Sequence, residues 1–257
     1  MYAGGSLERA VLPGVFSVLF QTSAIPHPGS ALKNNDAHAV WPGERPAGKS
    51  PPRERNEALF MGMDAIYTRR SIRKFRPDAL PRDVIDAILD AARVAPSGKN
   101  AQPWRFVVLG GESKAAFCAC MEAGLQREAD APLLPESRGG LPDAWHTLGI
   151  MRQAPVLVAV LNCCDGSPFA PSSAGERVSE LVNTQSIGAA IQNMLLKAED
   201  LSVGSLWIAN TFFAYPELTA FLETERQLVA AVALGYAGEQ PNARPRKPLE
   251  SLVTYRL

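Results

Sequence analysis

The sequence predicts a layered domain of the α/β or α+β class. From residue 64 onward, short apolar runs typical of buried strands alternate with stretches of helical periodicity. Two of the runs, 155–161 and 228–234, contain no polar residue, which indicates strands covered on both faces. Several buried strands between helices imply a sheet with helices packed against it.

Signals for helices and strands alternate along the chain. A helix begins near Pro81, since proline in the first turn followed by Asp83 is typical of a helix start, and it ends before Pro96. The remaining expected elements are strands at 104–109, 155–161, 206–208 and 228–234, helices at 112–128, 175–200 and 216–222, and a Pro/Gly-rich loop at 131–142. The stretch 186–196 is apolar nearly all round, which indicates a helix at a core centre or a subunit interface.

Residues 1–60 differ in kind from the remainder. The segment 42–53 is rich in proline, glycine and charge, and it buries too little apolar surface to offset its ordering entropy. We expect residues 1–60 to be a disordered extension or a mis-called upstream start, and residues 61–257 to form the folded domain. The apolar segment 11–20 lacks a basic flank and is a poor signal peptide, although a cleaved targeting segment stays an alternative.

Composition excludes several classes of function. Lys plus Arg (26) equals Asp plus Glu (26), whereas general nucleic-acid binding requires a basic excess. The apolar stretches are too short to span a bilayer. The four cysteines lack the C-x-x-C spacing of a metal or redox site, so we expect free thiols, no metal and a cytoplasmic location.

The chain has no protein-only catalytic constellation. It contains no G-x-G-x-x-G after a strand, no P-loop and no G-x-S-x-G elbow, and its three histidines are scattered. We therefore name no catalytic residue, and an enzyme with this sequence would need a cofactor.

The run 69–74 is the clearest candidate binding segment. It places four cations, Arg69, Arg70, Arg73 and Lys74, around the hydroxyl of Ser71. The planar fork of donors on arginine matches phosphate oxygens two at a time, and serine suits a phosphate or ribityl oxygen. The alternative is a solvated basic turn.

The segment 95–104 joins a helix to a strand and is dense in small and amide residues. Asn100 and Gln102 each offer a donor and an acceptor, as recognition of a heteroaromatic edge requires. The residues before them, Pro96, Ser97 and Gly98, let the backbone approach a flat ligand. The alternative is an ordinary loop anchored by Trp104.

A second basic run lies near the C-terminus. Prolines around it enforce an extended path, in which Arg244 and Arg246, two residues apart, point to the same side. This run could complete one anion site with the run 69–74, or it could be a solvated tail.

Taken together and in this order, these segments resemble the nitroreductase family of flavoproteins. The resemblance covers 61–257 and is carried by RRSIRKF at 69–75, PSGKNAQPW at 96–104, and GYAGEQP at 235–241 followed by R-x-R-K-P-L-E. MRQAPVLV at 151–158 and GAAIQNMLL at 188–196 are also similar to family sequence.

The resemblance implies an α+β fold with a mixed sheet flanked by helices, built as an intertwined homodimer with FMN at the interface. It implies that the phosphate and ribityl chain contact Arg69, Arg70, Ser71, Arg73, Arg244 and Arg246. It further implies that the isoalloxazine is lined, from the other subunit, by Pro96, Ser97, Gly98, Asn100 and Gln102. Ala209 and Asn210 match the segment whose backbone N–H faces flavin N5. Many relatives carry glycine there, so Asn210 either leaves that contact to the backbone or alters substrate access.

The activity that the resemblance implies is transfer of electrons from NAD(P)H, by a ping-pong mechanism through FMN, to a nitroaromatic, quinone or similar electron-poor acceptor. Within enzymes, the alternatives are a reductive dehalogenase, an enoate reductase or a flavin-fragmenting enzyme. Outside enzymes, they are a flavin-binding redox sensor without turnover and a non-flavin anion-binding domain.

Overall fold

The computed structural model describes residues 64–257, so the predicted extension at 1–60 and the predicted domain start at residue 61 lie outside the described residues. The elements in chain order are α2 (Asp64–Thr68), α3 (Arg82–Arg93), η1 (Gly98–Asn100), β1 (Trp104–Gly110), α4 (Gly111–Asp130), η2 (Pro135–Gly140), α5 (Leu141–Gln153), β2 (Val156–Asn162), α6 (Ala174–Asp200), β3 (Gly204–Ile208), η3 (Asn210–Ala214), α7 (Tyr215–Phe221), β4 (Gln227–Gly235) and η4 (Leu249–Ser251). No helix among the described residues is both long enough and apolar enough to cross a membrane.

The four strands form one antiparallel sheet in the order β1-β2-β4-β3. A parallel bridge between Ser71 and Ser205 extends it beyond β3. The α+β class is confirmed, and this bridge is the parallel component of the predicted mixed sheet within the described residues.

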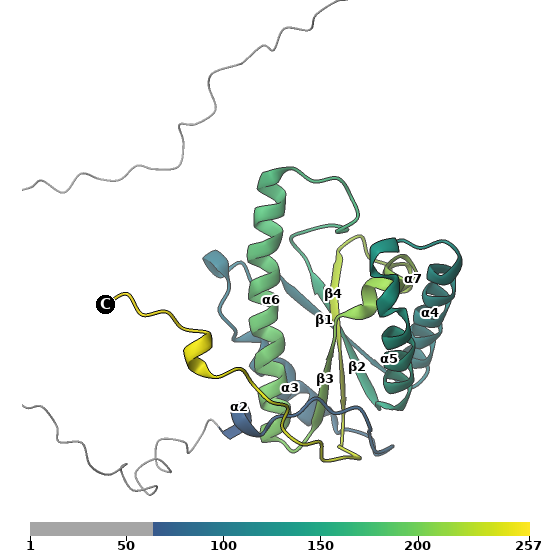
Figure 1. Cartoon of the computed structure of the whole chain (residues 1–257). Helices are drawn as coiled ribbons and strands as arrows, with labels where there is room; N and C mark the ends of the chain where they lie inside the picture. Colours follow the sequence, from purple (N-terminus) through teal and green to yellow (C-terminus); the bar gives the residue numbers. More distant parts are fainter. Residues whose placement is uncertain (1–63) are drawn as a thin grey trace, which may run out of the picture. The chain divides into compact units, whose positions relative to one another are not determined.

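Helices cover both faces of the sheet, with α3 and α6 on one side and α4, α5 and α7 on the other (Figure 1). Along the central strand β2, Leu157 and Ala159 pack into the α4 layer, while Val158 and Val160 pack into the α6 layer. Successive strand residues face opposite layers, so a strand covered on both sides needs an apolar residue at every position. This requirement explains the uninterrupted apolar runs of β2 and β4.

The long helix α6 begins with a capping box. The Ser173 hydroxyl accepts from the Glu176 backbone N–H at 3.2 Å, and the Glu176 carboxylate accepts from the Ser173 N–H at 2.7 Å. Farther along, residues such as Ile187 and Ile191 are fully buried against the sheet. Near its start, however, α6 exposes three large apolar side chains, Val178 (62%), Leu181 (62%) and Val182 (44%).

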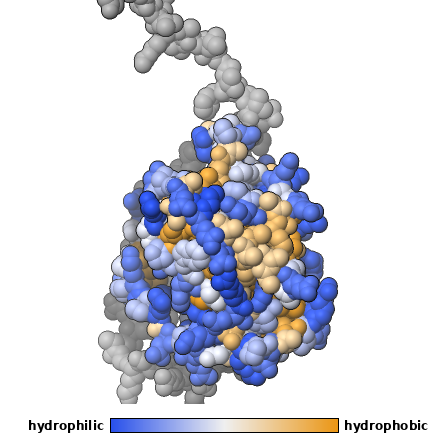
Figure 2. All heavy atoms as spheres, turned by 90° about the vertical axis from the view of Figure 1, so that its right-hand side faces the viewer, coloured by the Kyte–Doolittle hydropathy of each residue, from blue (hydrophilic) through white to orange (hydrophobic). Residues whose placement is uncertain are grey.

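On the opposite layer, α4 buries large side chains and exposes small ones. Phe117, Met121 and Leu125 are fully buried. The exposed side of the helix carries four alanines, Ala115, Ala116, Ala119 and Ala123. Figure 2 views the molecule from the side on which α4 lies in Figure 1 and shows a pale apolar area there. Alanine adds little apolar area, so this helix is amphipathic in side-chain size more than in polarity.

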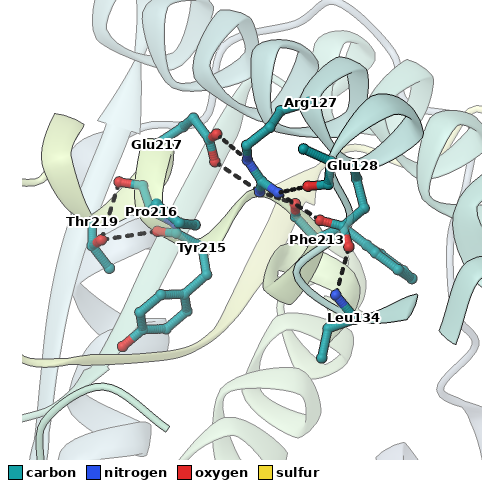
Figure 3. Close-up of polar contacts among 9 residues, drawn as sticks. Arg127, Glu128, Leu134, Phe213, Tyr215, Pro216, Glu217 and Thr219 are labelled. Carbon is teal, nitrogen blue, oxygen red and sulfur yellow. Dashed lines mark hydrogen bonds and ion pairs between the residues drawn. The ribbon is translucent and has the colours of Figure 1, made fainter. Parts of the chain in front are cut away.

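A partly buried network of ion pairs and hydrogen bonds around Arg127 fastens α4 to η3 and α7 (Figure 3). Arg127 donates to Glu217 at 2.6 Å, to Glu128 at 2.7 Å and to the carbonyl of Phe213 at 2.9 Å. Glu128, with 2% of its side chain exposed, also accepts from the backbone N–H of Leu134 at 2.7 Å. Burial raises the pKa of Glu128, but backbone hydrogen bonds from the 133–134 segment and the Arg127 guanidinium outweigh burial and lower it.

Candidate functional site

The predicted basic run 69–74 lies between β3 and the chain that leaves β4. The N–H of Ile72 donates to the Ser205 carbonyl at 3.0 Å, and the N–H of Gly238 donates to the Lys74 carbonyl at 2.8 Å. Ile72 and Phe75 are buried in the core, with 6% and 9% exposed. These anchors fix the backbone of the run while its polar side chains remain outside the core.

The two basic runs meet at one cavity of about 340 Å³. Its walls include every residue that we predicted for the phosphate and ribityl chain: Arg69, Arg70, Ser71, Arg73, Arg244 and Arg246. Five guanidinium groups thus share a lining that contains no carboxylate. The structure brings together segments that lie far apart in the sequence: Arg73 and Arg244, for example, are about 170 residues apart.

Some hydrogen-bond donors of these arginines have partners in the described residues, and others have none. Arg69 Nε is buried and has no hydrogen-bond partner among the described residues. Arg70 uses Nη1 to donate to the carbonyls of Tyr67 (2.7 Å) and Thr68 (2.8 Å) at the end of α2. None of the five arginines forms an ion pair with a carboxylate in the described part of the chain. A buried donor without a partner is costly, and a bound anion would satisfy it.

The lining also contains Pro241, the last residue of the GYAGEQP motif, and four residues that no sequence motif identified: Ile66, Tyr67, Asn242 and Ala243. They carry no charge pattern of their own. Their position immediately beside the two basic runs was the one signal that could have identified them.

The predicted segment 96–102 does not line this cavity in a single chain. It packs instead near the start of α6, where the N–H of Gly98 donates to the Ser186 hydroxyl at 3.3 Å. A Cβ on Gly98 would lie 2.7 Å from Val182 Cγ1, so glycine permits this close approach.

The backbone of this segment is unusual. Lys99, Asn100 and Gln102 all have left-handed conformations, with φ of 53°, 55° and 46°. Such backbone is uncommon outside glycine and is found where the surroundings enforce it, often at functional sites. The side chains of Asn100 and Gln102 are exposed in the single chain and therefore free to contact another molecule.

Ala209 and Asn210 lie at the end of β3 and the start of η3, and neither lines the cavity. Asn210 donates through Nδ2 to the Thr147 hydroxyl of α5 at 3.0 Å, and its Oδ1 is buried without a partner. The side chain is therefore committed to α5, while Ala209 is exposed. This geometry favours the alternative in which only the backbone of the segment faces a ligand.

The family model described as the Nitroreductase family matches residues 66–236. The chain belongs to the nitroreductase family. The matched range includes the first basic run and the segment 96–102 but ends before Arg244, so the second basic run lies beyond it.

Individual relatives agree with this membership. A Methanothermobacter thermautotrophicus protein described as an NADH dehydrogenase/NAD(P)H nitroreductase is 31% identical over 191 residues, 71% of this chain and 80% of the relative. The 5,6-dimethylbenzimidazole synthase of Rhodospirillum rubrum is 29% identical over 189 residues, 70% of this chain and 83% of the relative. A Desulfovibrio desulfuricans protein, described as a nitroreductase and solved in complex with FMN, superposes with a TM-score of 0.56 at 27% identity, covering 76% of this chain and 96% of its own.

Proposed function

We propose that this nitroreductase-family protein is an FMN-dependent oxidoreductase. It would pass electrons from NAD(P)H, by a ping-pong mechanism, to nitroaromatics, quinones or similar electron-poor acceptors. The observation that carries the proposal is the arginine-lined cavity with its unsatisfied buried donor at Arg69. A relative solved with FMN supports the choice of cofactor.

The residues of the cavity fit the phosphate end of FMN. Arg69, Arg70, Arg73, Arg244 and Arg246 supply cationic forks, and Ser71 supplies a short hydroxyl donor. Bound FMN would supply the redox chemistry that the side chains lack. The protein would hold and orient the cofactor and tune it by positive charge, and solvent would protonate the product, so we assign no catalytic side chain.

The isoalloxazine site would be completed by a second subunit in an intertwined homodimer. In this arrangement Pro96, Ser97, Gly98, Asn100 and Gln102 of one subunit face the cofactor held by the other, and the backbone at Ala209 and Asn210 faces flavin N5. Two apolar surfaces support such a partner. One is the exposed start of α6, and the other is the C-terminal tail, which exposes Leu252 (64%) and Tyr255 (73%).

The proposed location is the cytoplasm. All four cysteines are free thiols, and Cys164 is exposed. An exposed thiol without a disulfide partner suits a reducing compartment.

The visible spectrum of the purified protein tests the proposed function most directly. We expect a yellow protein that is bleached by anaerobic NADH or NADPH and recolours when a quinone is added. Steady-state oxidation of NAD(P)H with the quinone would then measure turnover. A yellow protein that no nicotinamide bleaches would indicate a redox sensor, and a colourless protein that ignores added FMN would overturn the proposal.

A flavin-fragmenting enzyme is the second candidate, because one relative is described as 5,6-dimethylbenzimidazole synthase. That product contains a dimethyl-substituted benzene ring, as isoalloxazine does. Incubation of the FMN-loaded protein with NAD(P)H, oxygen and a quinone as acceptor, followed by chromatography, separates the candidates. Release of 5,6-dimethylbenzimidazole would favour the second, and intact FMN with reduced acceptor would favour the first.

Replacing Arg73 by alanine is expected to weaken FMN binding by about 1.5–3 kcal/mol, the range for a hydrogen bond to a charged group. Arg73 lines the cavity and its side chain bonds no carboxylate among the described residues. Quenching of flavin fluorescence on titration of the apo-protein measures the dissociation constant. Lys74→Ala is the matched control, because Lys74 belongs to the same run but does not line the cavity. Unchanged affinity in Arg73→Ala would remove this residue from the site.

Replacing Leu181 by glutamate is expected to raise the dissociation constant of the homodimer at least about tenfold, since the new carboxylate would be buried without a partner. Sedimentation over a range of protein concentrations measures this constant. Ala119→Glu adds the same charge to the exposed side of α4, on the other layer, and should leave association unchanged. A dimer equally stable in both variants would exclude the start of α6 from the interface.

A further inference from the structure

The carboxylate of Glu239 accepts hydrogen bonds from the backbone of the first basic run. Its Oε1 atom accepts from the N–H of Arg73 at 2.5 Å and from the N–H of Lys74 at 3.1 Å. Glu239 is half-buried and follows β4 by four residues. A side chain from the tail therefore bonds the backbone, rather than the side chains, of the run.

This contact continues a ladder between the two segments. Arg76 N–H donates to the Tyr236 carbonyl at 2.9 Å, Phe75 and Ala237 form an antiparallel bridge, and Gly238 N–H donates to the Lys74 carbonyl. A Cβ on Gly238 would lie 3.3 Å from the Lys74 oxygen, so the backbones are close here.

Beyond Gly238, no backbone hydrogen bond joins the run 69–74 to the tail in the described residues. The Glu239 carboxylate is thus the last connection before Pro241, where the second wall of the cavity begins. Both walls contribute arginines, and their ability to meet one phosphate depends on their separation. A few tenths of an ångström decide whether a charged hydrogen bond forms with good geometry.

The negative charge of Glu239 should itself affect anion binding at the cavity. A negative charge bonded to the backbone of the arginine-rich run opposes the binding of an anion nearby, so removing this charge should tighten anion binding if charge alone mattered. Glu239 therefore acts on anion binding in two opposite ways: its charge disfavours the anion, and its hydrogen bonds hold the backbone of Arg73 and Lys74.

We propose that Glu239 is a positioning residue for the anion cavity: its carboxylate holds the Arg73 wall against the Pro241–Arg246 wall so that both converge on one phosphate. The inference rests on the proposed function in taking FMN as the natural ligand. It concerns a residue that lies beyond the range matched by the family model.

Two conservative variants separate reach from charge. Glu239→Gln keeps the length of the side chain and an accepting oxygen but removes the charge. Glu239→Asp keeps the charge but withdraws the oxygen by one methylene. In FMN titrations of the apo-protein, we expect Glu239→Asp to weaken binding about tenfold or more and Glu239→Gln to stay within about threefold of the wild type or bind more tightly. Weakened binding in Glu239→Gln with unchanged binding in Glu239→Asp would overturn the proposal, as would unchanged binding in both.

A double-mutant cycle tests whether Glu239 acts through Arg73. If it does, Glu239→Asp should cost less FMN affinity in an Arg73→Ala background than in the wild type. Equal costs in the two backgrounds would overturn that route of action. Thermal unfolding of each apo-variant separates a general loss of stability from a local change. If Glu239 only positions the cavity wall, Glu239→Asp should weaken FMN binding while its unfolding midpoint stays close to that of the wild type.

The same variants distinguish failure of this inference from failure of the proposed function. If the wild type binds no FMN, the proposed function fails, and titration with inorganic phosphate still compares Glu239→Asp with Glu239→Gln at the cavity. If the wild type binds FMN and the two variants do not differ, the cofactor assignment stands and the role of Glu239 is wrong.

Discussion

Replacement of Arg127 by methionine is expected to lower the free energy of unfolding by about 3 kcal/mol, the lower end of the range for breaking a buried ion pair, because Arg127 is itself 28% exposed. Glu128, with only 2% of its side chain exposed, would keep its hydrogen bond from the Leu134 N–H but lose the guanidinium beside it. The Phe213 carbonyl and the Glu217 carboxylate would lose their donors as well. Urea unfolding at pH 7 measures the loss.

Two control variants test whether the loss of stability arises because Glu128 is buried. Arg152 and Glu122 form an ion pair with the same 2.7 Å separation, but their side chains are 49% and 37% exposed. Arg152→Met should therefore cost no more than about 1 kcal/mol. The double variant Arg127→Met/Glu128→Gln should recover part of the loss, because it removes the buried charge along with its partner. A double variant as unstable as the single one would show that packing, and not charge, dominates.

The free energy of unfolding should depend on pH through the protonation of Glu128. In the wild type the pKa of Glu128 is lowered on folding, so its contribution to stability is complete above the ordinary glutamate value of 4.5 and is lost as the pH falls through the lowered folded value. In Arg127→Met, burial acts with less opposition, and the pKa of Glu128 rises relative to the wild type. The stability difference between wild type and variant should therefore narrow as the pH falls from 7 toward 4. A constant difference would contradict the assignment to Glu128.

This ion pair could not be predicted from the sequence, whereas the sheet could. β2 and β4 are buried along nearly their whole length, so their composition identifies them without any knowledge of neighbours. The network of Arg127 instead depends on Glu217, 90 residues away, and on a backbone carbonyl whose orientation no composition reveals. The helical boundaries differ for a similar reason: the predicted loop 131–142 contains the turn η2, and α5 already begins at Leu141.

The candidate site also contains residues that the sequence predicts and residues that only the structure reveals. Arginine clusters mark both walls of the cavity, because anion recognition requires particular side chains that are visible in the sequence. The neutral lining at Tyr67 and Asn242 and the connection through Glu239 depend on three-dimensional proximity alone. The role of the segment 96–102 stays a prediction, because a single chain does not bring it to the cavity.

Replacement of Gly124 by alanine is expected to lower the free energy of unfolding by about 3 kcal/mol, in the upper part of the range for overpacking a core. The substitution would ordinarily stabilise a helix, since alanine is favoured over glycine by about 1 kcal/mol. Here, however, the new Cβ would lie 2.3 Å from Ala214 Cβ and 2.4 Å from Ala214 Cα. These atoms have no rotamer to change, so α4 would have to separate from η3 and α7.

Gly149→Ala in α5 is the matched control for this effect, because a Cβ there would meet nothing within 4 Å. We expect it to stabilise the protein by about 0.5–1 kcal/mol, so the two glycine substitutions should have opposite signs in urea unfolding. Stabilisation by both would show that α4 tolerates separation from η3. Because η3 begins at Asn210, the Gly124→Ala variant also links packing to the proposed site. If the backbone there faces the flavin, FMN-loaded Gly124→Ala should show a shifted flavin absorption band even in the fraction that remains folded, whereas Gly149→Ala should not.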